Sequence, residues 1–419
     1  MAFLHERLEN GLDVVAEVID GALSTSVGFF VKTGARDESD AIWGVSHFLE
    51  HMVFKGTTEL SADDINRRFD RLGASANAFT SEEDTVYYAV VLPEQQDEVV
   101  DLLARMMRPA LREEDFGTEK LVILEEIRMY DDQPPFGADE RCRAAFFRDH
   151  PLGRSVLGTV DSIEALPVAA MREYHARRYA PEGMVLAATG AVDFPALVAS
   201  ARAVCGGWEP RGGGARPGVG TGWAARAAGG RGAAARETII RAAATLTYGV
   251  RATAGPDERD DDRYAAKLLA TVLGDGSGSR LYWSLVDTGE AEQATCQHLD
   301  FLDAGMFVTQ LACDAADADP LMERIVELYA ASRDGGIPPA EFEQARNKLA
   351  ARVVLAGEKP RRRLFDVGLE WARSGRYRTV ADSLAIVEAL TRDDLERVQA
   401  GWPLAGPGVT VLAGPLEAA

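Results

Sequence analysis

The chain carries the stretch His47-Phe48-Leu49-Glu50-His51, which holds two imidazoles and one carboxylate within five residues. Histidines four residues apart lie on the same face of a helix, so His47 and His51 can bind one metal ion. Glu50 lies on the same helical turn, where its carboxylate reaches a water molecule bound to that metal. We therefore expect a helix here that carries a metal-dependent hydrolytic site.

The alternative is that these are ordinary helix histidines with an accidental spacing. The chain has only six histidines, and one such motif by chance is roughly a one-in-a-hundred event. A metal site is therefore favoured, but catalytic zinc usually has three protein ligands and an open position for water. The third ligand should come from another element, and Glu119, Glu125 and Glu126 on a predicted helix from Glu113 to Tyr130 are the candidates.

The spacing of these glutamates leaves the third ligand open. Glu119 and Glu126 are seven residues apart, about two helical turns, and share a face, whereas Glu125 is rotated roughly 100° from Glu126. An acidic face that points at a cation and a solvated charged stripe explain this spacing equally well.

Outward from the motif, apolar patterns and turn residues predict an α+β fold. Its sheets are mixed and largely antiparallel, built from hairpins packed by helices, and are not a βαβ repeat. Ser61 is expected to cap a helix that Gly73 closes. The first half has expected strands at 12–19, 24–33, 74–80 and 85–92, with a turn at 20–21, and helices at the motif, 61–72, 94–107 and 113–130.

The second half repeats the first in outline, after a stretch dominated by Gly, Ala, Arg and Pro that reads as a flexible linker. We predict a catalytic zinc-binding domain at 1–206, the linker at 207–236, and a second similar domain at 237–419. The later copy has Ala265, Leu268 and Leu269 in place of the motif, and Ala345 and Arg352 in place of Glu119 and Glu126. It is therefore expected to bind no metal.

Composition limits the classes of partner and the cellular compartment that we expect for the protein. The formal net charge is −21, from 66 acidic and 45 basic residues, which disfavours a nucleic-acid partner because phosphate binding needs a basic face. Residues 1–8 lack the features of a secretory signal, and no apolar run approaches membrane-spanning length. The four cysteines are widely spaced, so we expect buried, reduced thiols and a cytoplasmic protein without membrane contact.

The segment from His47 to Thr57 resembles the signature of the pitrilysin (insulinase) family of zinc metallopeptidases. The resemblance is strongest to the small bacterial members, which are similar to the mitochondrial processing peptidase β subunit, and it covers nearly the whole chain. Four other parts of the chain carry it: 8–12, 77–80, 119–127, and 150–154 with 158–159.

This resemblance implies one Zn²⁺ per chain, with Glu126 as the third ligand and Glu119 as a group that orients the site. Glu125 is then only a fallback ligand. Glu50 would act as the general base in hydrolysis of short or unfolded peptides.

The resemblance also implies that Asn77, Ala78 and Phe79 bind an extended peptide substrate through main-chain hydrogen bonds. The alternative is that this strand is a core strand with no exposed edge.

Two residues of the family pattern are missing. Members that work alone carry an arginine and a tyrosine that reach the substrate and the developing oxyanion, and Val286 and Gln293 occupy those places here. Arg280, nearby, matches an arginine that is structural in the family. Such a chain resembles the catalytic subunit of a dimer. One form of this dimer is a heterodimer, in which a related chain supplies the arginine and the tyrosine. The alternative is a non-catalytic assembly subunit, which the intact metal motif argues against.

Overall fold

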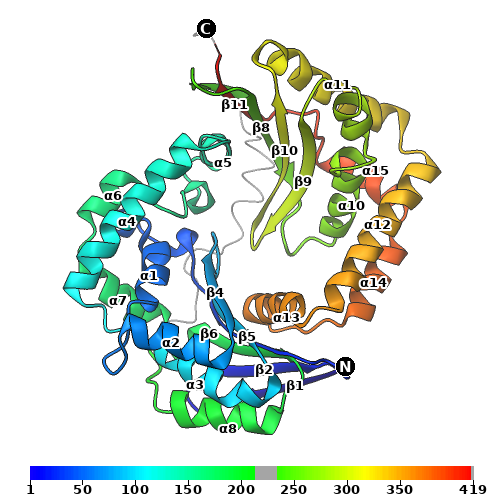
Figure 1. Ribbon diagram of the computed structural model, residues 1–419. Coiled ribbons are helices and arrows are strands. Elements are labelled where there is room, and N and C mark those ends of the chain that lie inside the picture. The colour runs from blue at the N-terminus through cyan, green and yellow to red at the C-terminus, as the bar shows by residue number, and fades with distance from the viewer. Residues whose placement is uncertain (213–233, 417–419) are drawn as a thin grey trace. The chain divides into compact units, whose positions relative to one another are not determined.

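The computed structural model describes residues 1–212 and 234–416, which form two compact units (Figure 1). Most of the predicted linker, residues 213–233, lies outside the described residues. The described part of the first unit is 1–127, 154–212 and 355–379, and that of the second is 128–153, 234–354 and 380–416.

These units differ from the predicted limits, 1–206 and 237–419, because each contains one segment of the other half. Residues 355–379 belong to the first unit and residues 128–153 to the second. Residue composition along the chain gives no sign of this exchange, which depends on long-range packing. In addition, strand β7 (Ala235–Ile240) begins one residue before the predicted end of the linker.

The sheet of the first unit has six strands in the order β1-β2-β6-β3-β5-β4. Only β2 and β6 run parallel, and the other neighbours are antiparallel. The predicted turn between β2 and β3 is present, with Gly21 at φ 77°, but β6 lies between the two strands. The strands are β1 (Ala2–Arg7), β2 (Asp13–Val18), β3 (Thr25–Val31), β4 (Ser75–Thr80), β5 (Thr85–Val91) and β6 (Met184–Gly190).

The helices of the first unit cover both faces of this sheet. The predicted helix caps are present: the Ser61 hydroxyl accepts a hydrogen bond from the Asp64 N–H, and Gly73 ends that helix at φ 60°. The helices are α1 (Val45–Val53), α2 (Ala62–Leu72), α3 (Gln96–Met106), α4 (Glu113–Asp132, of which 128–132 belong to the second unit), α6 (Val160–Ala165), α7 (Val168–Arg178), α8 (Phe194–Cys205) and α13 (Pro360–Ser374).

The first core lies between the sheet and helices α1, α3 and α8, and α13 packs on the opposite face. Strand alternation divides the side chains: Val14 and Ala16 enter the first core, whereas Val15 contacts the α13 side. Gly368 allows α13 to approach closely, because a Cβ atom there would lie 2.3 Å from the Phe30 ring.

The second sheet has five strands in the order β7-β11-β8-β10-β9. Its first pair is parallel and the others are antiparallel, so order and direction match β2-β6-β3-β5-β4. The prediction of two similar α+β domains is therefore confirmed. The remaining elements are β8 (Thr247–Gly255), β9 (Gln293–Phe301), β10 (Ala304–Cys313), β11 (Val409–Gly414), α5 (Ala138–Phe147), α10 (Asp262–Gly274), α11 (Ala318–Gly335), α12 (Pro339–Gly357), α14 (Val380–Ala389) and α15 (Arg392–Gly401).

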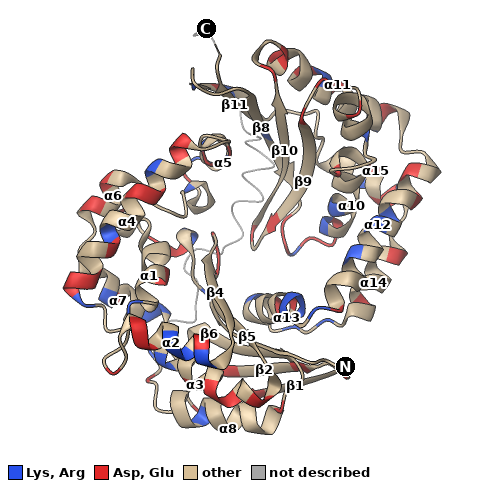
Figure 2. Ribbon diagram, in the orientation of Figure 1, with Lys and Arg blue, Asp and Glu red and all other residues tan. Residues whose placement is uncertain are grey.

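The distribution of charged residues and the state of the cysteines agree with what the composition predicts. Acidic residues are distributed over the helices of each unit, with basic residues among them (Figure 2). All four cysteines are buried free thiols. Within the described ranges, no helix has both the length and the apolar character needed to cross a bilayer.

A buried ion pair attaches α13 to the first sheet. The Arg363 guanidinium donates to both carboxylate oxygens of Glu17, at 2.8 and 2.5 Å, and the Tyr377 hydroxyl donates to the same carboxylate at 2.6 Å. The Arg363 and Glu17 side chains are only 4% and 0% exposed.

We predict that Arg363→Met lowers the free energy of unfolding by about 3–5 kcal/mol, because it leaves the Glu17 carboxylate buried without its cation. Urea denaturation of the full chain measures this change. The control is Arg397→Met, whose ion pair with Asp262 is more exposed and should cost at most about 1 kcal/mol. Equal effects of the two substitutions would contradict the assignment.

Candidate metal centre

Helix α1 presents the motif and begins at a buried cap. The Glu38 carboxylate accepts hydrogen bonds from the N–H groups of Gly44 and Ser46, both at 2.7 Å. A carboxylate at this position satisfies backbone donors that a helix start leaves unpaired. The apolar side of α1 enters the first core through Val45, Phe48, Leu49, Met52 and Val53, which leaves the histidines on the other side.

The structure brings His47, His51 and Glu126 together. The Glu126 Oε2 atom lies 3.8 Å from His47 Nε2 and 3.6 Å from His51 Nε2, and one ligand atom of each residue lies within 4.8 Å of the other two. These distances are too long for hydrogen bonds. Ligand atoms about 2.0–2.1 Å from a tetrahedral zinc are roughly 3.3 Å apart. The three groups therefore fit a shared metal ion with modest adjustment.

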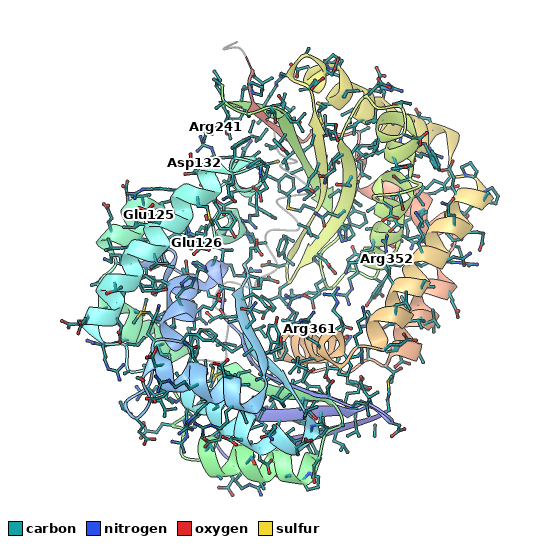
Figure 3. The ribbon with its side chains drawn as sticks, viewed as in Figure 1. Glu125, Glu126, Asp132, Arg241, Arg352 and Arg361 are labelled. Atoms are coloured by element: carbon teal, nitrogen blue, oxygen red, sulfur yellow. The ribbon has the colours of Figure 1, made fainter. Side chains whose placement is uncertain are left out.

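Glu126, and not Glu125, is the glutamate that meets the histidines. Both are on α4 (Figure 3), and their roughly 100° separation around the helix axis leaves Glu125 exposed to solvent. Within the part of the chain that the structure describes, the group formed by His47, His51 and Glu126 is the one metal-type cluster found.

Glu119 contacts Nδ1 of His51, the ring nitrogen that is not near Glu126. Its Oε1 atom lies 2.8 Å from His51 Nδ1, and its Oε2 atom lies 2.5 Å from Lys55 Nζ. An ionised carboxylate only accepts, so Nδ1 donates, and in the neutral ring Nε2, on the Glu126 side, is the nitrogen with a lone pair for a metal. Burial disfavours the charge, but the hydrogen bonds from His51 and Lys55 hold the pKa of Glu119 below its usual range. The role that the family resemblance implies for Glu119, as a group that orients the site, stays a prediction.

The two imidazoles differ in charge preference. Burial, and secondly the charge of His51, lowers the pKa of His47 to about 3, so this ring is neutral at neutral pH, as a metal ligand must be. Burial also disfavours the charged form of His51, but its hydrogen bond with Glu119 and the charge of Glu126 raise its pKa. Burial raises the pKa of Glu126, and the His51 charge opposes that effect. These preferences make the group suited to a cation.

Glu50 lies on α1 beside this group. The Thr80 hydroxyl donates a 2.6 Å hydrogen bond to Glu50 Oε2. Burial raises the pKa of Glu50, and the Thr80 hydrogen bond opposes this effect. A carboxylate with a raised pKa accepts and returns a proton more readily near neutral pH. The sequence motifs do not identify Thr80 as a site residue, although it ends the segment 77–80 that carries the resemblance.

Asn77, Ala78 and Phe79 lie on β4, an edge strand whose one strand partner among the described residues is β5. The alternative of a core strand without a free edge is therefore wrong. Ala78 faces the α1 side of the sheet, whereas Phe79 faces α13 and contacts the Phe365 ring at 5.6 Å between centroids. The side chains of β4 thus alternate between the two faces of the sheet. Substrate binding along this strand stays a prediction.

The second unit has no counterpart of the metal group among its described residues. In α10, Ala265, Leu268 and Leu269 are buried in the second core. In α12, the Arg352 side chain (Figure 3) forms an ion pair with Asp275. Apolar packing and this pair thus replace the ligands.

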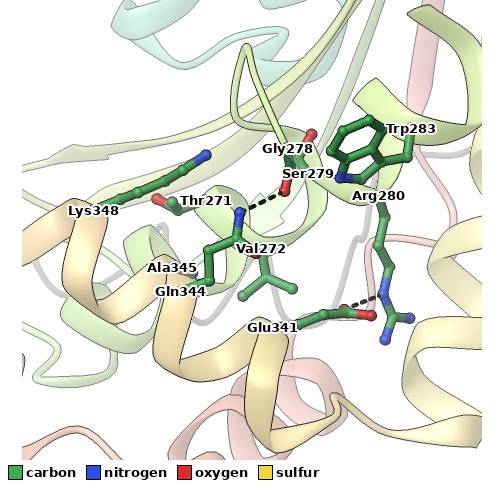
Figure 4. Close-up of a pocket in the computed structure, with 10 residues that line it drawn as sticks. All are labelled: Thr271, Val272, Gly278, Ser279, Arg280, Trp283, Glu341, Gln344, Ala345 and Lys348. Carbon is green, nitrogen blue, oxygen red and sulfur yellow. Dashed lines mark hydrogen bonds and ion pairs between the residues drawn. The ribbon is translucent and has the colours of Figure 1, made fainter. Parts of the chain in front are cut away.

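A cavity of about 220 Å³ lies beside α12 in the second unit (Figure 4). Its charged residues are paired: Arg280 donates to Glu341 at 2.8 Å, and Lys348 donates to Asp275 at 2.8 Å. Arg280 also donates to the Gly336 carbonyl, which agrees with the structural role expected for it. Its lining consists of Thr271, Val272, Gly278, Ser279, Arg280, Trp283, Glu341, Gln344, Ala345 and Lys348.

Val286 and Gln293, which occupy the places of the missing arginine and tyrosine, lie in the second unit. Val286 ends a π-helical turn, Tyr282–Val286, and is half-buried against the second core. Gln293 is exposed at the start of β9. Neither residue offers a guanidinium or a phenol.

Comparison with known proteins gives the same family for both halves. The model of the family described as Insulinase (Peptidase family M16) matches residues 13–160 and so includes every residue of the metal group. The model described as Peptidase M16 inactive domain matches residues 165–349, in the half without the group.

Relatives are similar along most of their length. An uncharacterized zinc protease of Mycobacterium tuberculosis is 35% identical over 395 residues, covering 93% of this chain and 88% of the relative. The uncharacterized zinc protease YmxG of Bacillus subtilis is 31% identical over 392 residues, covering 93% of this chain and 92% of the relative.

Two solved structures show the same fold. A protease from Helicobacter pylori has a TM-score of 0.90 at 22% identity, covering 99% of each chain. A peptidase M16 inactive domain from Pseudomonas fluorescens has a TM-score of 0.88 at 18% identity, covering 100% of this chain and 99% of that one. With the matched family models and the relatives of more than 30% identity, these findings confirm the expected membership: this chain belongs to the insulinase family, peptidase family M16.

Proposed function

We propose that this chain is a zinc-dependent endopeptidase that hydrolyses peptide bonds of short or unfolded peptides. One Zn²⁺ per chain would be held by His47, His51 and Glu126. The observation that carries the proposal is the convergence of these three side chains, from α1 and α4, beside the carboxylate of Glu50. The zinc protease names of the relatives support the same chemistry.

The residues of the site have distinct tasks. Zinc held by such ligands lowers the pKa of a bound water and polarises the substrate carbonyl. Glu50 accepts a proton from the attacking water and then delivers it to the leaving amine. Glu119 keeps the His51 ring in the orientation that directs Nε2 at the metal.

The free edge of β4 favours extended substrates. A peptide that pairs with a strand edge forms main-chain hydrogen bonds whatever its side chains are. Folded proteins rarely offer such a free, extended segment, so Asn77, Ala78 and Phe79 would receive short or unfolded peptides.

We further propose that the chain is the catalytic subunit of a dimer, with a related chain that supplies the arginine and tyrosine. Val286 and Gln293 lack the donors that stabilise a developing oxyanion, and loss of one such donor typically costs about 2.7–4 kcal/mol of transition-state stabilisation.

A non-catalytic assembly subunit is the alternative function. Its weakness is that an assembly role does not require His47, His51 and Glu126 to converge beside Glu50, nor the contacts of Glu119 with His51 and Lys55. Proteolysis that depends on Glu50 would distinguish the two.

We predict that Glu126→Gln weakens zinc binding by more than the roughly 10- to 100-fold typical of losing an outer hydrogen bond, because it removes a charged ligand. Competition with a chromogenic chelator measures the affinity. Glu125→Gln is the matched control on the adjacent position and should bind zinc like the natural chain. Equal zinc loss in both variants would contradict the ligand assignment.

We predict that Glu50→Gln keeps one zinc per chain and lowers kcat by about 10²–10⁴-fold, because the amide cannot accept the proton. Metal analysis and cleavage of a quenched peptide library measure the two quantities. Undiminished peptidase activity in this variant would overturn the general-base assignment.

We predict weak activity from the isolated chain and a gain of about 10²-fold or more when a related subunit restores the oxyanion donors. The measurement compares kcat of the purified chain with kcat of the chain mixed with a related subunit that lacks the histidine motif but has the arginine and tyrosine. Full activity from a purified homodimer would rule out the heterodimer.

A further inference from the structure

We propose that Thr80 is the positioning residue for Glu50, so that the strand edge that receives the peptide also sets the orientation of the general base. This inference rests on the proposed function. In this role Thr80 acts through Glu50.

The first observation is the contact itself. The hydroxyl of Thr80 donates to Glu50 Oε2 at 2.6 Å, a short, charge-assisted hydrogen bond when the carboxylate is ionised. With Oε2 held by this bond, Oε1 is the oxygen that can take the proton of the attacking water. A glutamate has three rotatable side-chain bonds, so one such contact removes much of its freedom.

The second observation is the direction of the side chain. Ala76 and Ala78 pack against the core that contains α1, and Phe79 packs on the opposite side of the sheet. Alternation along the strand places Thr80 on the same side as the two alanines. The small alanines leave room for α1, and the hydroxyl at the end of this row reaches its carboxylate.

The third observation is that Thr80 is itself firmly held. Its strand pairing to Thr85 is the last of β4, and the Ser81 N–H donates to the Asp84 carbonyl at 2.8 Å to close the turn. Two ion pairs hold the turn: the buried pair of Glu83 with Arg36 at 2.5 Å, and the pair of the buried Asp84 with the partly exposed Arg373 at 2.6 Å.

Gly34 brings a second segment against the same turn. A Cβ atom at Gly34 would lie 2.4 Å from the Ser81 carbonyl oxygen and 2.6 Å from the Glu83 nitrogen. The Arg36 N–H donates to the Glu82 carbonyl at 2.9 Å. The hydroxyl of Thr80 therefore projects from a rigid backbone, which is the condition for fixing the position of another group.

The consequence concerns substrate and base together. A peptide paired along β4 takes its position from the backbone of 77–79, and Glu50 takes its position from the next residue of the same strand. The same strand thus positions both the general base and the scissile bond. A displacement of about 1 Å between such groups can cost about 10²-fold in rate.

Thr80→Val, which removes the hydroxyl at nearly constant shape, tests the proposal. We expect kcat to fall about 10- to 100-fold, with KM, zinc content and melting temperature unchanged. Thr80→Ser restores the donor and should recover kcat to within about threefold of the natural chain. Thr295→Val is the matched control, because Thr295 lies on β9, the corresponding edge strand of the second sheet, and should leave kcat unchanged.

The Glu50→Gln background separates the possible outcomes. If Thr80 acts through Glu50, adding Thr80→Val to Glu50→Gln causes no further loss. The proposal is overturned if Thr80→Val keeps kcat within twofold of the natural chain, or if Thr80→Ser is as slow as Thr80→Val. It is also overturned if the losses of kcat from the two single substitutions multiply in full in the double variant. Activity that survives Glu50→Gln would instead overturn the proposed function itself.

Discussion

The hydrogen bond between His51 Nδ1 and Glu119 Oε1 is the contact on which the site depends, because it joins α1 to α4. One turn earlier on α1, the rings of Phe48 and Phe116 stack at 4.5 Å and fix the separation of the helices. Once the helices are aligned in this way, the residue seven positions after Glu119 faces the histidines. That residue is Glu126, so one polar and one apolar contact are enough to place the third ligand.

Local patterns predicted the parts of this arrangement that depend on one helix or one turn. The spacing of His47 and His51, the cap at Ser61 and the end at Gly73 follow from short-range geometry and backbone preferences. The choice between Glu125 and Glu126 did not follow from spacing, because it depends on which face of α4 meets α1. Thr80 was missed for the same reason: its partner is 30 residues away, on a different element.

Long-range packing accounts for the rest of the fold that local patterns could not show. Strand β6 enters between β2 and β3 from a distant part of the chain, and its apolar side chains differ little from those of any buried strand. The pair of Glu17 and Arg363 joins residues 346 positions apart. A charged residue in an otherwise helical pattern suggests solvent exposure, so nothing nearby in the sequence marks Arg363 as buried.

The charges of the first unit favour a divalent cation at this site. The carboxylates of Glu50, Glu119 and Glu126 surround two imidazoles, and Lys55 compensates the charge of Glu119 through its ion pair. Burial raises the pKa values of Glu50 and Glu126, which means that both carboxylates gain from a nearby positive charge. A dication between the imidazoles and Glu126 balances these two charges at once. In the second unit, Leu268 and Leu269 are buried where the motif would stand, and no metal-type cluster is found among the residues of that unit that the structure describes.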